Sequence, residues 1–329
     1  MGTPLDQPNG QAGVPGAVPA TAPSQTPGVL CHNLRRFFGK VPAVVDVTFD
    51  APAGAITGLI GPNGSGKTTL LLILAGLLKP DAGTAHVAGF DLASQSQAAR
   101  AVTGWMPDVF GTWDALTCNE ILTFFARAYG MSDQLAKARA HQLLQTVYLS
   151  EYANAPARVL SRGQKQRLGL ARALVHDPTV LLLDEPASGL DPRSRVELRD
   201  LLKALAGAGK TILLSSHVLS ELDEIVDQAV FLTGGRTVSL DVAQTAMTQR
   251  GWRLGGLDMA GLTNFLNANH VPWQPSNAQS GEVIVNLPST EMAAALLRDL
   301  VGAGVPMHTM APVSGRLEEA YLALNEERL

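Results

Sequence analysis

A glycine-rich segment from Gly61 to Thr68 carries the clearest chemical signal in the chain. Glycines lack a Cβ atom, so their backbone can curl around a phosphate group and point its amides inward. The Lys67 ammonium adds a full positive charge, and the Thr68 hydroxyl is a candidate Mg²⁺ ligand. The segment therefore predicts a site for a nucleoside triphosphate. Its residues, Gly61, Pro62, Asn63, Gly64, Ser65, Gly66, Lys67 and Thr68, fit the phosphate-binding pattern G-x-x-x-x-G-K-[ST].

The residues on both sides of this loop fit the strand and the helix that such a loop requires. Ala55–Ile60 reads as a buried strand, and the apolar run Thr69–Leu78 predicts a buried helix. That helix would direct the positive end of its dipole at the phosphates, with Thr69 beside the nucleotide. The alternative is a glycine-rich turn that matches the pattern by chance, and the flanking elements argue against it.

A second apolar strand ends in two carboxylates. Val180–Leu183 is followed by Asp184 and Glu185. In proteins with a phosphate-binding loop, a carboxylate at such a strand end holds Mg²⁺, which suits Asp184. Glu185 is then placed to orient the attacking water or to accept its proton. The ordinary alternative is a solvated turn, but the loop in the same chain favours a catalytic pair.

Ser161 begins a predicted helix, over Gly163–Leu174, that offers a second anion site. Taken alone, this is an ordinary helix start. Together with the other motifs, however, the chain resembles the ABC-type ATPases over about Val29 to Thr237. Five motifs occur in that family's order: Gly61–Thr68, Leu160–Gln164, Val180–Glu185, Ser188–Asp191 and His217.

The resemblance implies ATP and Mg²⁺ as ligands and ATP hydrolysis as the reaction. Leu160–Gln164 is similar to the family signature, most often LSGGQ, and departs from it at Arg162. Arginine is tolerated at a helical position, so we expect little loss of nucleotide chemistry. The resemblance assigns nucleotide contacts to Ser161, Gly163 and Gln164.

Further roles follow from the same resemblance. His217 corresponds to a histidine that contacts the γ-phosphate, and a neutral ring donating one hydrogen bond could also position the water. Asp191 corresponds to an aspartate that links the two sites of a dimer. Phe38 falls where an aromatic ring stacks on adenine, with Phe37 as the rival and core packing as the alternative.

Asp108 departs most clearly from the family, which usually has glutamine there. In the family, this side chain reaches Mg²⁺ and water, and its loop contacts the membrane subunit. Aspartate is shorter and charged, so it could bind Mg²⁺ but would repel the γ-phosphate. Metal ligation and coupling to the membrane subunit are therefore both open at Asp108.

Composition bounds the class of protein. The formal net charge of −4 gives no general attraction to nucleic acid or to anionic lipid. The two cysteines, Cys31 and Cys118, lack metal-site spacing and suit a reducing cytoplasm. The sequence has no apolar stretch long enough to span a bilayer, and we expect no secretory signal. We therefore expect a protein that reaches the cytoplasmic face of the membrane only through a partner.

We predict an α/β fold: a P-loop NTPase core with a mainly parallel sheet, an antiparallel β edge and a helical subdomain. Residues 1–28 read as a disordered Pro/Gly/Ala-rich tail. Residues 29–237 form the ATPase domain, with the helical subdomain at about 94–157. Residues 238–329 predict a small α+β domain in the order β-α-β-β-α-β, ferredoxin-like, with a final helix at Leu317–Asn325.

The resemblance further implies two copies docked head to tail around two ATP molecules, driving a permease made of separate chains. Thr103–Tyr129 and Leu317–Leu324 are similar to the branch that partners ABC-2-type exporter permeases. The alternative is a soluble ABC ATPase acting in translation or DNA repair. A single motif set and the absence of basic clusters count against it. The sequence leaves open whether the dimer is a homodimer or a heterodimer, which substrate is transported and what the C-terminal domain does.

Overall fold

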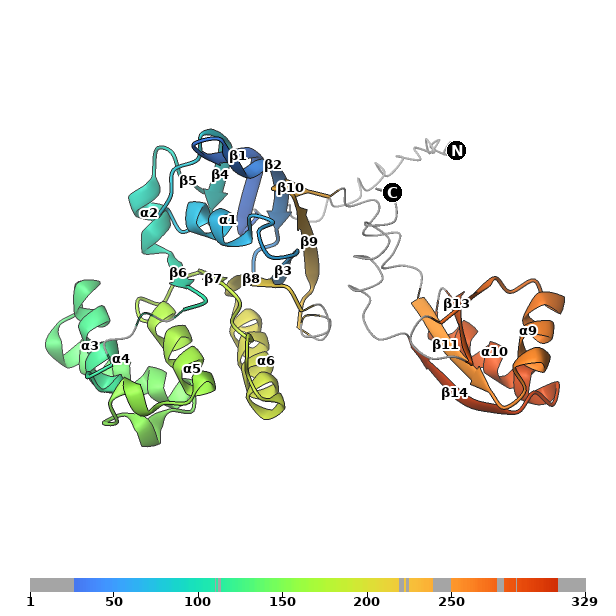
Figure 1. Cartoon of the computed structure of the whole chain (residues 1–329). Coiled ribbons are helices and arrows are strands. Elements are labelled where there is room, and N and C mark those ends of the chain that lie inside the picture. Colours follow the sequence, from blue (N-terminus) through green and yellow to red (C-terminus); the bar gives the residue numbers. More distant parts are fainter. Residues whose placement is uncertain are drawn as a thin grey trace, which may run out of the picture.

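The computed structural model describes two parts of the chain (Figure 1). The larger covers residues 27–238, with gaps at 110, 112–113, 219–221 and 223–224. The smaller covers residues 250–312, with gaps at 277–280 and 288. The tail expected at 1–28 lies almost wholly outside the described residues, and the helix expected at Leu317–Asn325 lies wholly outside them. Every helix in the described parts is too short or too polar to cross a lipid bilayer.

The larger part is built on one sheet of ten strands, in the order β5-β4-β1-β2-β10-β9-β3-β8-β7-β6. From β9 to β6 each strand runs parallel to its neighbour. The strands β5, β4, β1 and β2 are antiparallel to one another and form the predicted β edge. The strands are β1 (Val29–Phe38), β2 (Val41–Ala51), β3 (Ile56–Ile60), β4 (Ala82–Val87), β5 (Phe90–Asp91), β6 (Thr103–Met106), β7 (Val180–Leu183), β8 (Thr211–Ser216), β9 (Gln228–Thr233) and β10 (Arg236–Thr237).

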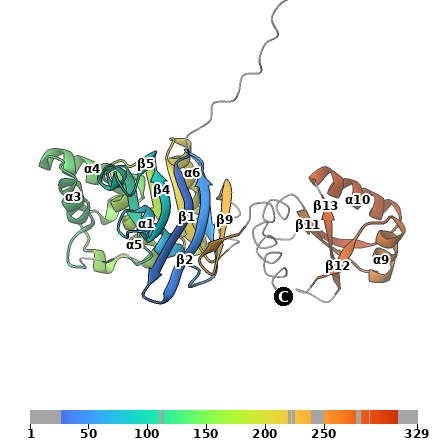
Figure 2. The same cartoon turned by 90° about the horizontal axis from the view of Figure 1, so that it is seen from above.

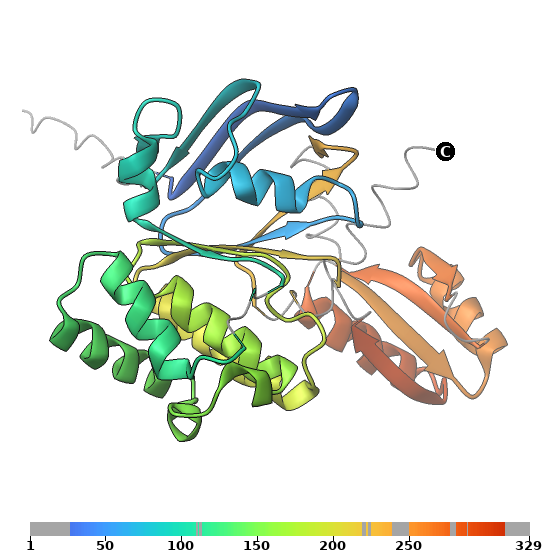
Figure 3. The same cartoon turned by 60° about the vertical axis from the view of Figure 1, so that its left-hand side comes forward.

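Helices cover both faces of the parallel strands. Because successive side chains of a strand point to opposite faces, β7 contributes Leu182 to one core and Leu181 and Leu183 to the other. Figure 3 shows α1 between the parallel strands and the antiparallel edge, with α3, α4, α5 and α6 on the opposite face. The helices are α1 (Lys67–Leu74), α2 (Ser96–Ala101), α3 (Cys118–Ala128), α4 (Asp133–Thr146), α5 (Arg162–Ala173) and α6 (Pro192–Gly207).

The helix after the phosphate-binding loop differs from the prediction of Thr69–Leu78. It begins two residues earlier, because Gly66 takes a left-handed φ of 102° and serves as its N-cap. It also ends earlier, at Leu74, because Gly76 turns the chain with a φ of +66°. Lys67 and Thr68 therefore stand in the first turn of α1, where its free backbone amides lie.

The smaller part has the predicted β-α-β-β-α-β order (Figure 2). Its sheet is antiparallel, with strand order β12-β13-β11-β14, as in ferredoxin-like folds. Alternate residues of β13 pack in one cluster with Leu266 and Leu300, so both helices cover one face of the sheet. The elements are β11 (Arg250–Gly256), α9 (Met259–Ala268), β12 (Trp273–Pro275), β13 (Glu282–Leu287), α10 (Thr290–Gly302) and β14 (Met307–Pro312).

Candidate active site

The loop Gly61–Thr68 leaves β3 at the carboxyl edge of the parallel strands. Gly64 and Gly66 have φ values of 81° and 102°, a region that glycine adopts without strain. A Cβ atom on Gly61 would lie 2.1 Å from the Leu232 carbonyl oxygen, and one on Gly66 would lie 2.4 Å from that of Ala43. Close packing against backbone therefore requires glycine at these positions.

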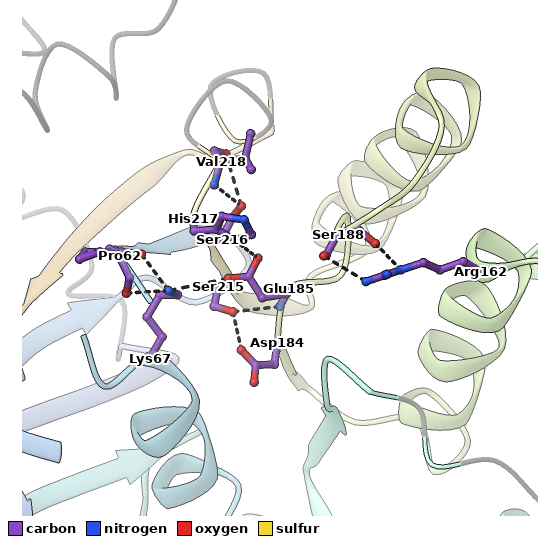
Figure 4. Close-up of polar contacts among 11 residues, drawn as sticks. Pro62, Lys67, Arg162, Asp184, Glu185, Ser188, Ser215, Ser216, His217 and Val218 are labelled. Atoms are coloured by element: carbon purple, nitrogen blue, oxygen red, sulfur yellow. Dashed lines mark hydrogen bonds and ion pairs between the residues drawn. The ribbon is translucent and has the colours of Figure 1, made fainter. Parts of the chain in front are cut away.

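Lys67 is 6% exposed and points back over the loop (Figure 4). Its Nζ donates hydrogen bonds to the carbonyl oxygens of Gly61, at 2.8 Å, and Pro62, at 3.3 Å. The same atom lies 3.7 Å from Glu185 Oε1. The ammonium thus lies between the phosphate-binding loop and the predicted catalytic carboxylate.

Asp184 and Glu185 follow β7, which lies beside β8 in the sheet. Asp184 is 2% exposed, and its Oδ1 accepts a hydrogen bond of 2.6 Å from the Ser215 hydroxyl. The oxygen of that hydroxyl accepts the backbone N–H of Glu185 at 2.9 Å. Ser215 thereby fixes both acidic residues, a role that the sequence did not predict. The sequence feature that points to this role is the pair of serines at the end of the strand, just before His217.

Glu185 adopts a left-handed φ of 49°, which is uncommon for a residue with a side chain. Its Oε2 lies 2.9 Å from His217 Nδ1. Because a carboxylate only accepts hydrogen bonds, Nδ1 is the donor, and a neutral ring is left with an acceptor at Nε2. The one hydrogen bond that a neutral His217 can donate therefore goes to Glu185. Donation to a phosphate would require a protonated ring or release of Glu185.

The residues of the second predicted anion site lie around the start of α5. The Ser161 hydroxyl accepts the Gln164 N–H at 3.2 Å, and Gln164 Oε1 accepts the Ser161 N–H at 2.9 Å. This capping box fixes the first turn of the helix. In Figure 4, Arg162 points from α5 toward Ser188, in a group separate from Lys67, Glu185 and His217.

Asp191 is the N-cap of α6. Its Oδ1 accepts the backbone N–H of Ser194 at 3.0 Å, and its Oδ2 accepts the Ser194 hydroxyl at 2.6 Å. These bonds, that of the hydroxyl first, lower the pKa of Asp191. The side chain of Asp191 therefore has a structural role in this chain, in addition to the predicted link between the two sites of a dimer.

Both candidates for adenine stacking lie on the surface at the end of β1. Phe38 is 49% exposed and Phe37 is 40% exposed, so neither is a core residue. The Arg36 guanidinium lies 5.0 Å from the centre of the Phe38 ring, within cation–π range. An exposed ring with a cation on one face fits the predicted stacking role.

Asp108 lies just beyond β6. Its Oδ1 is buried and has no hydrogen-bond partner among the described residues, and its carbonyl oxygen accepts a bond of 3.4 Å from Gln166 Nε2. A bound Mg²⁺ prefers oxygen ligands, and the predicted set of Thr68, Asp184 and Asp108 supplies them. In the described chain, His, Cys, Asp and Glu do not form a metal cluster of three or more. Mg²⁺ would therefore be held together with substrate phosphates.

A separate cavity of about 380 Å³ opens beside the edge strand β6, between the ends of α1, α3 and α5. The Arg172 guanidinium lies 5.3 Å from the centre of the Phe125 ring, and Tyr129 stacks on His176 at 3.9 Å. Burial lowers the pKa of both Arg172 and His176. The lining also includes Leu77, Arg100 and Trp105, so the cavity is basic and aromatic.

Comparison with known proteins identifies relatives of this chain. A family profile described as "ABC transporter" matches residues 44–188. The chain is 41% identical over 208 residues to the Nod factor export ATP-binding protein I of Burkholderia lata, covering 63% of this chain and 68% of that protein. It is 33% identical over 223 residues to a daunorubicin resistance ATP-binding protein of Streptomyces coeruleorubidus, covering 68% and 71%. A probable multidrug ABC transporter ATP-binding protein of Escherichia coli is 45% identical over 194 residues, covering 59% and 34%.

Solved structures share the fold of the larger part. One, described as the ATP binding subunit of an ABC transporter, has a TM-score of 0.59 and 29% identity, covering 66% of this chain and 92% of that chain. Another is a dimeric ATP-binding cassette in a post-hydrolysis state, bound to ADP and phosphate. Its TM-score is 0.59 at 26% identity, covering 64% of this chain and 97% of that chain.

Proposed function

The chain belongs to the ABC transporter ATP-binding proteins, and we infer that it powers export by a separate membrane permease. It binds and hydrolyses ATP as a transporter subunit. The observation that carries the proposal is the contact of Glu185 with both Lys67 and His217 at the phosphate-binding loop. The alternative of a soluble ATPase in translation or DNA repair is set aside, because the relatives are transporter subunits.

We propose that the phosphates of ATP bind the amides of Gly61–Thr68 and the first turn of α1, including Thr69. Lys67 Nζ then exchanges Glu185 for phosphate oxygens, because a buried ammonium needs compensating charge. Phe38 stacks on the adenine. Once the Lys67 ammonium binds phosphate oxygens in place of Glu185, the Glu185 carboxylate is free to bind the attacking water.

Mg²⁺ bound by Thr68 and Asp184, with Asp108 as the third candidate, would neutralise charge on the β- and γ-phosphates. Ser215 keeps Asp184 in a fixed position for this role. Glu185 accepts a hydrogen bond from the attacking water, and His217 holds the carboxylate in position. Hydrolysis then removes the γ-phosphate, which would lie between the loop and a second copy of the chain.

Two copies docked head to tail would complete each site. Ser161, Gly163 and Gln164 of one copy would bind the nucleotide held by the loop of the other, with Asp191 at the interface. The solved cassette bound to ADP and phosphate is itself a dimer. ATP binding would close the dimer, and hydrolysis would reopen it.

We further propose where the permease docks. The basic and aromatic cavity beside β6 fits a cytoplasmic segment of the permease that carries an acidic residue. Docking there would hold the protein on the cytoplasmic face of the membrane. Export is proposed because the relatives include a Nod factor export protein. We also propose an ATPase domain at 29–237, with its helical subdomain at about 94–157, and an accessory domain at 238–329.

The variant Glu185→Gln tests the proposal. It should keep ATP affinity but lower the rate of phosphate release by about 100-fold or more, because the amide is a poor base. It should also accumulate as an ATP-dependent dimer in size-exclusion chromatography. Glu151→Gln, a change of an exposed carboxylate, is the matched control. Normal phosphate release from Glu185→Gln would remove Glu185 from its role.

A further inference from the structure

Arg162 stands where the family signature usually has glycine, and its side chain has a defined position. Its Nε donates a hydrogen bond of 3.1 Å to the Ser188 carbonyl oxygen, and its Nη2 donates one of 3.2 Å to the Ser188 hydroxyl. The guanidinium therefore binds one residue through both backbone and side chain (Figure 4). A side chain with two partners on one residue loses rotational freedom and fixes the distance between its two segments.

The chain opposite Arg162 is shaped to receive it. Gly189 has a φ of +68°, and a Cβ atom there would lie 2.7 Å from Arg162 Nε. The guanidinium thus occupies the space beside a residue without a side chain. Any larger residue at this position would displace Arg162 and would also strain the backbone.

Ser188 in turn belongs to the turn that begins at the predicted catalytic residue. Its backbone N–H donates a hydrogen bond of 3.1 Å to the Glu185 carbonyl oxygen. On its other side, the Glu185 N–H is held by Ser215 at 2.9 Å. A displacement of Ser188 would therefore be transmitted to the backbone of Glu185, which already has a left-handed φ.

Contacts that do not involve Arg162 also hold the start of α5 against this segment. A Cβ on Gly163 would lie 3.2 Å from the Ser194 hydroxyl oxygen and 3.4 Å from Leu190 Cδ2, so the two helix starts are packed together. Loss of the arginine side chain would leave that packing intact. The contribution of Arg162 is specific to the turn between Glu185 and Asp191.

We propose that Arg162 is a positioning residue that couples the two ATP sites of the dimer. This inference rests on the proposed head-to-tail arrangement. In that dimer the start of α5 faces the nucleotide of the second copy, while Glu185 acts on the nucleotide of its own copy. A nucleotide bound at the start of α5 would then affect the position of Glu185 through Arg162 and Ser188. Occupancy of one site would thereby change hydrolysis at the other.

The test measures ATP hydrolysis by the full chain as a function of ATP concentration. Arg162→Gly and Ser188→Ala should each lower kcat by about three- to tenfold, less than a full hydrogen bond to a charged group is worth, because the effect reaches Glu185 only through the Ser188 backbone. The ATP concentration for half-maximal rate should change little. The Hill coefficient should fall toward one, because the sites become independent. The double variant should be no worse than Arg162→Gly alone.

Two further variants separate positioning from general damage. Arg162→Lys keeps a donor for the Ser188 carbonyl oxygen and should restore part of kcat and of the Hill coefficient. Arg193→Ala removes an exposed arginine of α6 and should leave both unchanged. Thermal unfolding of each variant checks that the fold is retained.

Additive effects of Arg162→Gly and Ser188→Ala, or an unchanged Hill coefficient in both, would overturn the proposal. So would a loss of ATP-dependent dimers when Arg162→Gly is combined with Glu185→Gln, because Arg162 would then bind the nucleotide directly. Absence of ATP hydrolysis in the unaltered protein would instead contradict the proposed function. The two failures are therefore distinguishable.

Discussion

At the level of single residues, the buried charge of Lys67 is held at the site by three partners. A buried ammonium is costly unless it is hydrogen-bonded and paired. Two loop carbonyl oxygens and the Glu185 carboxylate supply those partners. The same partners keep the ammonium beside the loop, so that phosphate can replace the carboxylate without a large movement of the side chain.

Lys67→Ala should lower ATP affinity by about 100-fold or more, since hydrogen bonds to charged groups are worth roughly 1.5–3 kcal/mol each. Titration with a fluorescent ATP analogue measures the effect. Lys137→Ala, at a lysine with a 63% exposed side chain, is the matched control and should bind normally. Unchanged affinity in Lys67→Ala would contradict the assignment of the loop.

Asp108 offers a prediction about metal dependence. Its buried and unpartnered Oδ1 is suited to a cation, so Asp108→Ala should raise the Mg²⁺ concentration for half-maximal hydrolysis several-fold. Mg²⁺ titration of ATPase activity gives the value, with Asp133→Ala on the surface of α4 as control. An unchanged Mg²⁺ requirement, together with lost stimulation by the permease, would assign Asp108 to coupling instead.

At the scale of elements, strand order explains why distant residues meet. The strands β3, β8 and β7 are adjacent and parallel, so their carboxyl ends lie at one edge of the sheet. The loop after β3, His217 after β8 and Glu185 after β7 are thereby brought into contact. None of these contacts depends on residues close to one another in sequence.

Helix α3 carries a capping box that can be tested independently of catalysis. The Thr117 hydroxyl accepts the Glu120 N–H, and Glu120 Oε2 accepts both the N–H and the hydroxyl of Thr117. Thr117→Ala should lower the free energy of unfolding by about 1 kcal/mol at neutral pH. Thr117→Ser keeps the hydroxyl and should lose much less. Equal losses in both variants would rule out a contribution from the cap hydroxyl.

The capping box also predicts a pH dependence. The hydrogen bonds from the Thr117 N–H and then its hydroxyl lower the pKa of Glu120 below its ordinary value of 4.5. A lowered pKa in the folded state stabilises the protein above pH 4.5, and this contribution is lost as the pH falls through the folded-state pKa. The difference between Thr117→Ala and the unaltered protein should therefore narrow in acid. Urea unfolding at two pH values checks this.

At the scale of the whole molecule, each described part has its own core. Two clusters of buried apolar residues lie within residues 56–231 and 29–232, and a third lies within residues 252–300. A part with its own core can fold alone. A chain ending at residue 238 should therefore keep ATP affinity and unfold cooperatively, as measured by nucleotide titration and thermal unfolding. Aggregation or lost affinity would instead make the smaller part necessary to the larger.

The sequence alone determined the features that depend on local geometry. The loop Gly61–Thr68 follows from glycine backbone freedom and lysine charge at fixed spacing, and the order of strands and helices follows from hydrophobic patterning. Both are properties of neighbouring residues. Helix ends were less predictable, because α1 begins and ends where Gly66 and Gly76 take positive φ values.

The contacts between segments far apart in the chain depend on how the strands and helices pack in three dimensions. Ser215 holds Asp184 across 31 positions of sequence, Gln166 holds the Asp108 carbonyl across 58, and Arg162 reaches Ser188 across 26. Sequence spacing carries no information about such pairs, because strand order and helix packing set their distances. For the same reason, the sequence could not predict that a neutral His217 donates its hydrogen bond to Glu185. The two residues meet because β7 and β8 are adjacent in the sheet.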